Sequence, residues 1–98
     1  MVESYGNSEA QKIFEEGKPK KMPSHLLKRT THLLDIMDNV ESLSDLKIKG
    51  FPPNIRLHKL RGEFKHKWAI DIDKVSGWRI TFEFKENAFH LVCVENYH

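Results

Sequence analysis

The feature that most constrains the fold is a change in the spacing of apolar residues close to Lys67. Apolar and polar residues alternate over 67–73 and again over 78–85, which is typical of half-buried β-strands. Ser76-Gly77 separates these two strands, and Glu86-Asn87 separates the second from a third expected over 88–95. Short turns between successive strands predict an antiparallel meander.

Before residue 67 the apolar residues recur with the spacing of a helix. Ser8 to Gln11 matches a capping box with Ser8 as the N-cap, and Gly17 suits the left-handed position that ends such a helix. A second helix is expected from Ser24, its N-cap, to about Val40, with a broad apolar stripe that belongs to the core.

The remaining segments are less regular. Residues 1–5 are interpreted as a short edge strand, whereas residues 41–57 lack a clean period and Pro52-Pro53 excludes a regular helix there. The sequence therefore predicts one two-layer α+β domain over residues 1–98. Two N-terminal helices would pack on one face of a small, mainly antiparallel twisted sheet.

The composition limits the classes of protein to consider. A chain of 98 residues suits one modest core, and it contains no run of the roughly 20 apolar residues that a membrane span needs. The N-terminus has no features of a secretory signal, and Cys93 is the single cysteine, so we expect a cytoplasmic protein. The six histidines show no compact ligand spacing, and we expect no metal and no cofactor.

Positive charge is concentrated in the middle of the chain. Residues 47–67 hold seven Lys or Arg against Glu63 alone, a formal balance of +6, whereas the segments on either side each have a balance of −2. Such a field attracts phosphate polyanions, although a solvated basic loop is the simpler alternative. The cations expected to bind RNA are Lys47, Lys49, Arg56, Lys59, Lys65 and Lys67.

The alternation in the second strand gives Arg79 a defined side. If Trp78, Ile80 and their successors face the helices, Arg79 points to the opposite face, where a ligand has access. The alternative is a surface arginine paired with Glu83 on the same face. In the third strand Phe89, Leu91 and Cys93 would share one side of the sheet. Because both sides of this strand are apolar, its register cannot be assigned from the sequence.

Three pieces of sequence resemble the HigB-like family of the RelE superfamily, in order and with similar gaps. They are residues 55–62 (IRLHKLRG), 67–70 (KWAI) and 77–84 (GWRITFEF), and the ending Glu95-Asn96-Tyr97-His98 is similar to the family's acidic–Tyr–His ending. The resemblance implies a RelE-like, microbial-RNase-like fold. It also implies a toxin that cleaves messenger RNA in the ribosomal A site and is neutralised by a HigA-like helix-turn-helix antitoxin. Operator DNA would be bound only through the complex of the two proteins.

The residues present fit RNA cleavage without a metal. The 2′-hydroxyl of the substrate attacks, so the reaction needs a base, an acid and cations at the phosphate. Imidazole transfers protons near neutral pH, and a guanidinium binds two phosphate oxygens at once. Carried over from the family, the catalytic residues are His58, Arg61, Arg79, Tyr97 and His98.

Asn96 departs from the family, which often has Asp before Tyr-His. An amide cannot act as a base. Three alternatives follow: the carboxylate is dispensable, Glu95 replaces it, or the enzyme is weak. We expect reduced but measurable activity. Two other functions stay open, namely a catalytically silent protein that only binds the antitoxin, and a toxin directed at DNA gyrase. His58 and His98 argue against gyrase, because such relatives generally lack these histidines.

Overall fold

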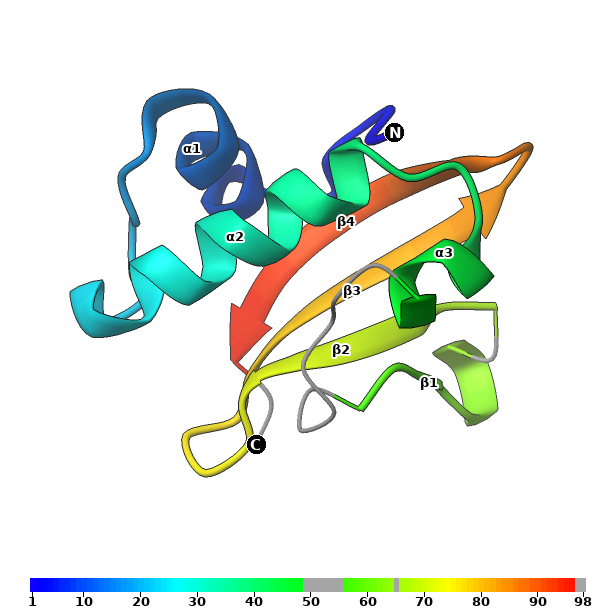
Figure 1. Cartoon of the computed structure of the whole chain (residues 1–98). Helices are drawn as coiled ribbons and strands as arrows, with labels where there is room; N and C mark the ends of the chain where they lie inside the picture. The colour runs from blue at the N-terminus through cyan, green and yellow to red at the C-terminus, as the bar shows by residue number, and fades with distance from the viewer. Residues whose placement is uncertain (49–55, 65, 97–98) are drawn as a thin grey trace.

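The computed structural model describes residues 1–48, 56–64 and 66–96. The helices in these ranges are α1 (Ser8–Glu16), α2 (Leu27–Asp38) and α3 (Leu43–Ile48), with short 3-10 helices η1 (Ser24–Leu26) and η3 (Gly62–Phe64). The strands are β1 (His58–Lys59), β2 (Trp68–Asp73), β3 (Trp78–Lys85) and β4 (Ala88–Asn96), which form an antiparallel sheet in chain order. The helices lie across one face of this sheet (Figure 1), so the predicted α+β architecture is confirmed.

The start of α1 differs from the sequence prediction. The N-cap is Asn7 rather than Ser8, and its side-chain oxygen accepts a hydrogen bond from the Ala10 N–H at 3.0 Å. Asn7 also donates to the Val94 carbonyl at 2.9 Å, so one side chain caps the helix and ties it to β4. The cap therefore lies one residue earlier than predicted. Gly17 ends α1 with φ 69°, as expected.

The predicted second helix is present in two parts. Residues 24–26 form the 3-10 helix η1, and α2 continues to Asp38. Ser24 is the first residue of η1 and not its N-cap. The N-cap position is occupied by Pro23, and no side-chain capping bond forms there. Helix α3 was not expected from the sequence. It contributes Leu46, which is fully buried in the same core as the apolar side of α2.

The core lies between the helices and the inner face of the sheet. Its fully buried side chains include Phe82, Phe89, Ile13, Leu33, Leu34, Met37, Leu46, Ile70, Ile72, Ile80, Val92 and Val94. Phe82 and Phe89, on neighbouring strands, meet edge to face with their ring centroids 5.0 Å apart. The alternation in β2 and β3 therefore correctly predicted which side chains face the core. The odd-numbered residues of β3 belong to the opposite face of the sheet.

A bulge in β4 corrects the predicted grouping of the third strand. Thr81 pairs with Cys93 but Glu83 pairs with His90, so β4 holds one extra residue over this stretch, and Leu91 adopts a positive φ of 52°. As a result Phe89, Val92 and Val94 all face the core, whereas the sequence grouped Phe89 with Leu91 and Cys93. The N-terminal segment forms parallel bridges from Val2 and Tyr5 to β4, a weaker form of the expected edge strand.

Candidate functional site

The face of the sheet away from the helices carries two rows of residues set by the strand register. In one row His58, Ala69, Thr81 and Cys93 are successive partners across β1 to β4. In the adjacent row Arg79 of β3 has Asp71 of β2 and Glu95 of β4 as its partners. Residues that are register partners share a face, so His58 and Arg79 lie on the same side of the sheet. We call this side of the sheet, which faces away from the helices, the open face, although Ala69 and Thr81 on it are buried.

The backbone before β1 orients the ring of His58. Its Nδ1 lies 2.7 Å from the carbonyl oxygen of Arg56. Because a carbonyl only accepts, Nδ1 carries the hydrogen and a neutral ring has its lone pair on Nε2. That tautomer can take a proton from a substrate hydroxyl. Arg56 itself has a left-handed φ of 43°, and its Nε donates to Asp71 at 2.9 Å, which fixes the segment against β2.

Arg79 lies between acidic residues from both neighbouring strands. Its Nη2 is 3.9 Å from Glu95 Oε1, and its side chain is only 16% exposed whereas that of Glu95 is 43% exposed. Glu83, the alternative partner expected from the sequence, has its Oε2 3.6 Å from His66 Nε2. Asp71 is also mostly buried, at 12% side-chain exposure, beside Arg56. The guanidinium is thus held in a defined position by the sheet, as recognition of a phosphate requires.

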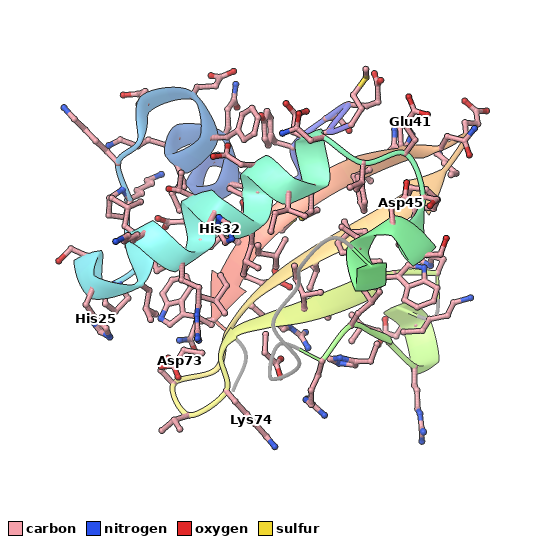
Figure 2. All side chains as sticks on the ribbon, in the orientation of Figure 1. His25, His32, Glu41, Asp45, Asp73 and Lys74 are labelled. Carbon is pink, nitrogen blue, oxygen red and sulfur yellow. The ribbon has the colours of Figure 1, made fainter. Side chains whose placement is uncertain are left out.

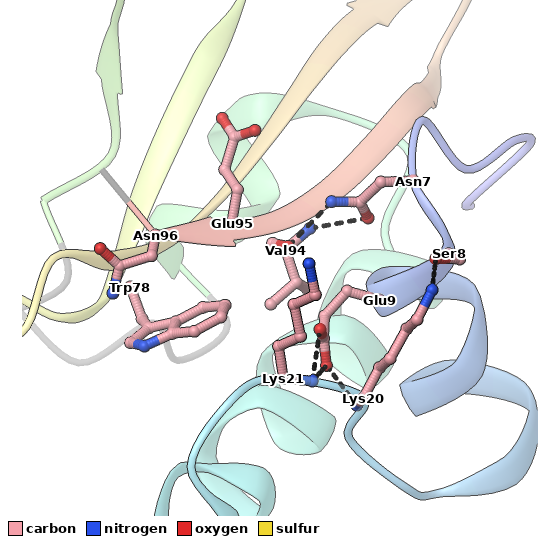
Figure 3. Close-up of a pocket in the computed structure, with 9 residues that line it drawn as sticks. All are labelled: Asn7, Ser8, Glu9, Lys20, Lys21, Trp78, Val94, Glu95 and Asn96. Carbon is pink, nitrogen blue, oxygen red and sulfur yellow. Dashed lines mark hydrogen bonds between the residues drawn. The ribbon is translucent and has the colours of Figure 1, made fainter. Parts of the chain in front are cut away.

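Glu95 and Asn96 point to opposite sides of β4. Glu95 accepts a hydrogen bond from the Thr81 hydroxyl at 3.3 Å on the open face. Asn96 is the partner of Trp78 and donates to the Ser76 carbonyl at 3.0 Å, at the turn between β2 and β3. Figure 3 shows Glu95 and Trp78 extending to opposite sides of the sheet. The carboxylate of the described C-terminal strand that faces Arg79 therefore comes from position 95.

A hollow of about 410 Å³ lies where the start of α1 meets the end of β4. Figure 3 shows the residues that line it. Its most buried charged group is Glu9, which accepts backbone N–H bonds from Lys21, at 2.8 and 3.0 Å, and from Met22 at 3.4 Å. These bonds tie the connector after α1 back to the helix. The role of Glu9 is structural, because its oxygens are occupied by the chain itself.

The central basic segment is divided between different surfaces. Lys59 is the partner of Trp68 and lies over its ring at 5.8 Å, so it does not share the open face with His58. Arg61 is exposed and lines a hollow at the edge of the sheet with Lys59 and His66. Lys67 lies close enough to Cys93 for its charge to affect that thiol.

Several predicted site residues fall elsewhere. Lys47 belongs to α3. Lys49, Lys65, Tyr97 and His98 lie outside the described residues. The structure therefore places His58, Arg56, Arg79 and Lys67 of the predicted set on the open face. It adds Asp71 and Thr81, which were identifiable from the alternation of the strands, and it places Glu95, raised from the sequence as a substitute for aspartate, beside Arg79.

Cys93 lies on the open face but is not poised to react. Burial raises the pKa of its thiol, with Glu95 adding to the effect and Lys67 opposing it. A raised pKa leaves less thiolate at neutral pH, and the thiolate is the nucleophile. We expect native Cys93 to react with iodoacetamide at pH 7.5 much more slowly than in urea, measured by mass spectrometry. Equal rates in the two conditions would contradict this assignment.

A comparison with solved structures identifies the fold. The crystal structure of a mutant of YafQ from E. coli superposes with a TM-score of 0.55, at 9% sequence identity, covering 97% of this chain and 94% of that one. At this identity the likeness concerns the fold alone. Helices on one face of a small antiparallel sheet are thus the fold that this chain shares with YafQ.

The family is shown by sequence. The sequence model of the family described as "RelE-like toxin of type II toxin-antitoxin system HigB" matches residues 3–98. The chain therefore belongs to the HigB-like toxins. The curated protein "Endoribonuclease HigB" of Proteus vulgaris is 26% identical over 98 residues, covering both chains completely. Within the described residues no helix is long and apolar enough to cross a membrane.

Proposed function

We propose that this protein is an mRNA endonuclease that acts in the ribosomal A site without a metal ion. The observation that carries the proposal is the position of His58 and Arg79 on one face of the sheet, with the His58 ring oriented by Arg56. The full-length similarity to a protein named endoribonuclease supports the same reaction. Action on the ribosome would require a cytoplasmic location.

The reaction would use the 2′-hydroxyl of the substrate as the nucleophile. A base removes its proton while the 2′-oxygen bonds to phosphorus, and the bond from phosphorus to the 5′-oxygen breaks as an acid protonates that oxygen. His58 would serve as the base through Nε2, and His98 as the acid. Arg79 would stabilise the extra negative charge at phosphorus, which is the largest contribution expected from a fixed cation.

The other predicted residues would bind and position RNA. Arg61 would add a second cation to the phosphate, and Tyr97 would stack on a base or hold the 2′-hydroxyl. The backbone contacts would come from Lys47, Lys49, Arg56, Lys59, Lys65 and Lys67. With few acid–base groups of its own, the toxin would depend on the ribosome to position the message. A HigA-like helix-turn-helix antitoxin would neutralise it and connect it to operator DNA.

Induction in growing cells, combined with mapping of mRNA ends on purified ribosomes, tests this function. Wild type should arrest growth and cut translated message, whereas His58→Ala should do neither while keeping its fold by circular dichroism. Arrest that survives both His58→Ala and His98→Ala would overturn the proposal and favour a toxin that acts without cleaving RNA. A supercoiling assay would then test DNA gyrase as its target.

The opposite directions of Glu95 and Asn96 change what we expect from position 96. Since Glu95 already supplies a carboxylate beside Arg79 and Thr81, Asn96→Asp should alter the cleavage rate by less than about threefold. Glu95→Gln keeps the shape but removes the charge, and it should slow cleavage by about tenfold or more. Single-turnover rates on ribosomes measure both. A large gain from Asn96→Asp would restore the simpler view that the enzyme is weak for lack of aspartate.

A further inference from the structure

A chain of contacts leads from the middle of the sheet to the ring of His58. Asp71 of β2 accepts a hydrogen bond from Arg56 Nε at 2.9 Å. The carbonyl oxygen of the same arginine lies 2.7 Å from His58 Nδ1. Arg56 is thus tied to β2 by its side chain, while its backbone holds the ring of the residue two positions later. Asp71 is therefore linked to His58 through Arg56.

The backbone of Arg56 needs such an anchor. Its φ of 43° lies in the left-handed region, which is unfavourable for a residue with a β-carbon. A residue keeps this conformation only where its surroundings hold it there. The side chain of Arg56 is 54% exposed whereas that of Asp71 is 12% exposed, so the carboxylate is the fixed partner of the pair. The ion pair with Asp71 thus fixes the conformation in which the Arg56 carbonyl meets the His58 ring.

Asp71 is itself placed by the sheet. In the strand order β2 lies between β1 and β3, and Asp71 is the register partner of Arg79 on β3. One carboxylate therefore lies between the arginine that orients His58 and the arginine proposed to bind the phosphate. Replacing a mostly buried ion pair by apolar residues of similar size often leaves a protein as stable or more so, and stability alone does not explain this carboxylate.

We propose that Asp71 is a positioning residue for His58, the proposed base, and that it acts through Arg56. The proposal rests on the function proposed above. By holding Arg56, Asp71 keeps the carbonyl that accepts the hydrogen of His58 Nδ1 in place, so the lone pair of the neutral ring is on Nε2. A base must be aligned with the hydroxyl whose proton it takes, and a small misplacement slows the reaction strongly. Loss of the Asp71 charge should therefore slow the chemical step.

The tautomer of His58 in the free protein is the first measurement, because it does not depend on cleavage. Long-range proton–nitrogen correlation spectra at about pH 8.5, above the usual titration range of imidazole, show which ring nitrogen carries the hydrogen. The signals that His58→Gln removes are those of His58. We expect the Nδ1–H form in wild type, and in Asp71→Asn a shift towards the Nε2–H form, which is the commoner one for a free imidazole.

Asp73→Asn is the matched control, since it is the same change two positions further along the chain. Figure 2 shows Asp73 where β2 meets the turn to β3. Its carboxylate accepts a hydrogen bond from the Ser76 hydroxyl at 2.6 Å, which lowers its pKa, and an amide oxygen can accept the same bond. Asp73→Asn should keep the Nδ1–H form of His58 and change the cleavage rate by less than about twofold.

Single-turnover cleavage on programmed ribosomes, with the toxin in excess, measures the consequence for the reaction. We expect Asp71→Asn and Arg56→Gln each to slow cleavage by about tenfold. The double variant should be slowed by about the same factor, because the two side chains act as one unit. Independent effects, which would multiply to about a hundredfold in the double variant, would overturn the proposal. If Asp71→Asn does not fold, Arg56→Gln tests the same pair from its exposed side, by the same two measurements.

Two further outcomes separate this inference from its alternatives. If Asp71→Asn slows cleavage but leaves the ring signals of His58 unchanged, Asp71 acts through its register partner Arg79 and the proposal is wrong. If wild type shows the Nδ1–H form and Asp71→Asn loses it, but wild type cuts no mRNA on ribosomes, the proposed catalytic function fails and the positioning of His58 by Asp71 is retained.

Discussion

Arg79→Ala is expected to lower the single-turnover rate of ribosome-dependent mRNA cleavage by about 10²- to 10³-fold, the usual loss when one preorganised charge-stabilising donor is removed. The arginine is mostly buried and is placed by the sheet between its register partners Asp71 and Glu95. An alanine there removes the cation and leaves two acids facing the substrate phosphate. The effect should appear in the rate of the chemical step as well as in binding.

Arg79→Lys and Lys85→Ala separate chemistry from general charge. Lysine keeps the positive charge but loses the planar fork, so we expect Arg79→Lys to recover part of the lost rate. Lys85→Ala removes an equal charge at the exposed end of the same strand and should leave the rate within about twofold. A thermal melt of each variant shows whether the fold survives. Full activity of a folded Arg79→Ala would remove the main support for the proposed mechanism.

The strand regions of this fold were predictable because one physical signal dominates there. In β2 and β3 every second side chain belongs to the core or packs against it, and the period alone gave the correct inner face and the side on which Arg79 lies. Turns were equally clear, since Glu86 and Asn87 adopt the positive φ values of 54° and 63° that a two-residue hairpin requires. Local sequence and long-range packing agree in these segments.

The sequence prediction was wrong, or could not be made, where long-range contacts determine the local structure. Asn7 is the N-cap of α1 because it also bonds to β4, which the sequence around residue 8 does not reveal. The bulge at Leu91 depends on pairing with β3 and on the N-terminal segment, where Ser4 Oγ accepts the Leu91 N–H at 2.9 Å. The short strand β1 has two residues and no detectable period, so its pairing with β2 could not be foreseen.

The same limit applies to the site. His58 and Arg79 were each identifiable, one by its chemistry and family position and the other by strand parity. That they share a face depends on the pairing of His58 with Ala69, which is a property of the folded sheet. Glu95 was raised as a substitute for the missing aspartate, but its direction relative to Asn96 depends on the register after the bulge.

Phe82→Ala is expected to cost about 3–5 kcal/mol of unfolding free energy, the usual loss for a buried phenylalanine. Its side chain is fully buried and its ring packs edge to face against Phe89. Small domains have roughly 5–15 kcal/mol in total, so this variant should be largely or partly unfolded at 37 °C. Urea titration followed by circular dichroism measures the loss. The control is Val75→Ala in the turn after β2, where the side chain is 95% exposed and the change should stay within about 0.5 kcal/mol.

Phe82→Leu and Arg79→Lys together test whether stability and catalysis are divided between the two faces of β3. Leucine at position 82 keeps most of the apolar volume, so we expect lower stability but a cleavage rate near that of wild type well below the unfolding temperature. Arg79→Lys should have the opposite profile, with a slower reaction and a smaller change in stability. If Phe82→Leu instead lost activity while remaining folded, the inner face would control the positions of Arg79 and Thr81, because one strand backbone carries both sets of side chains.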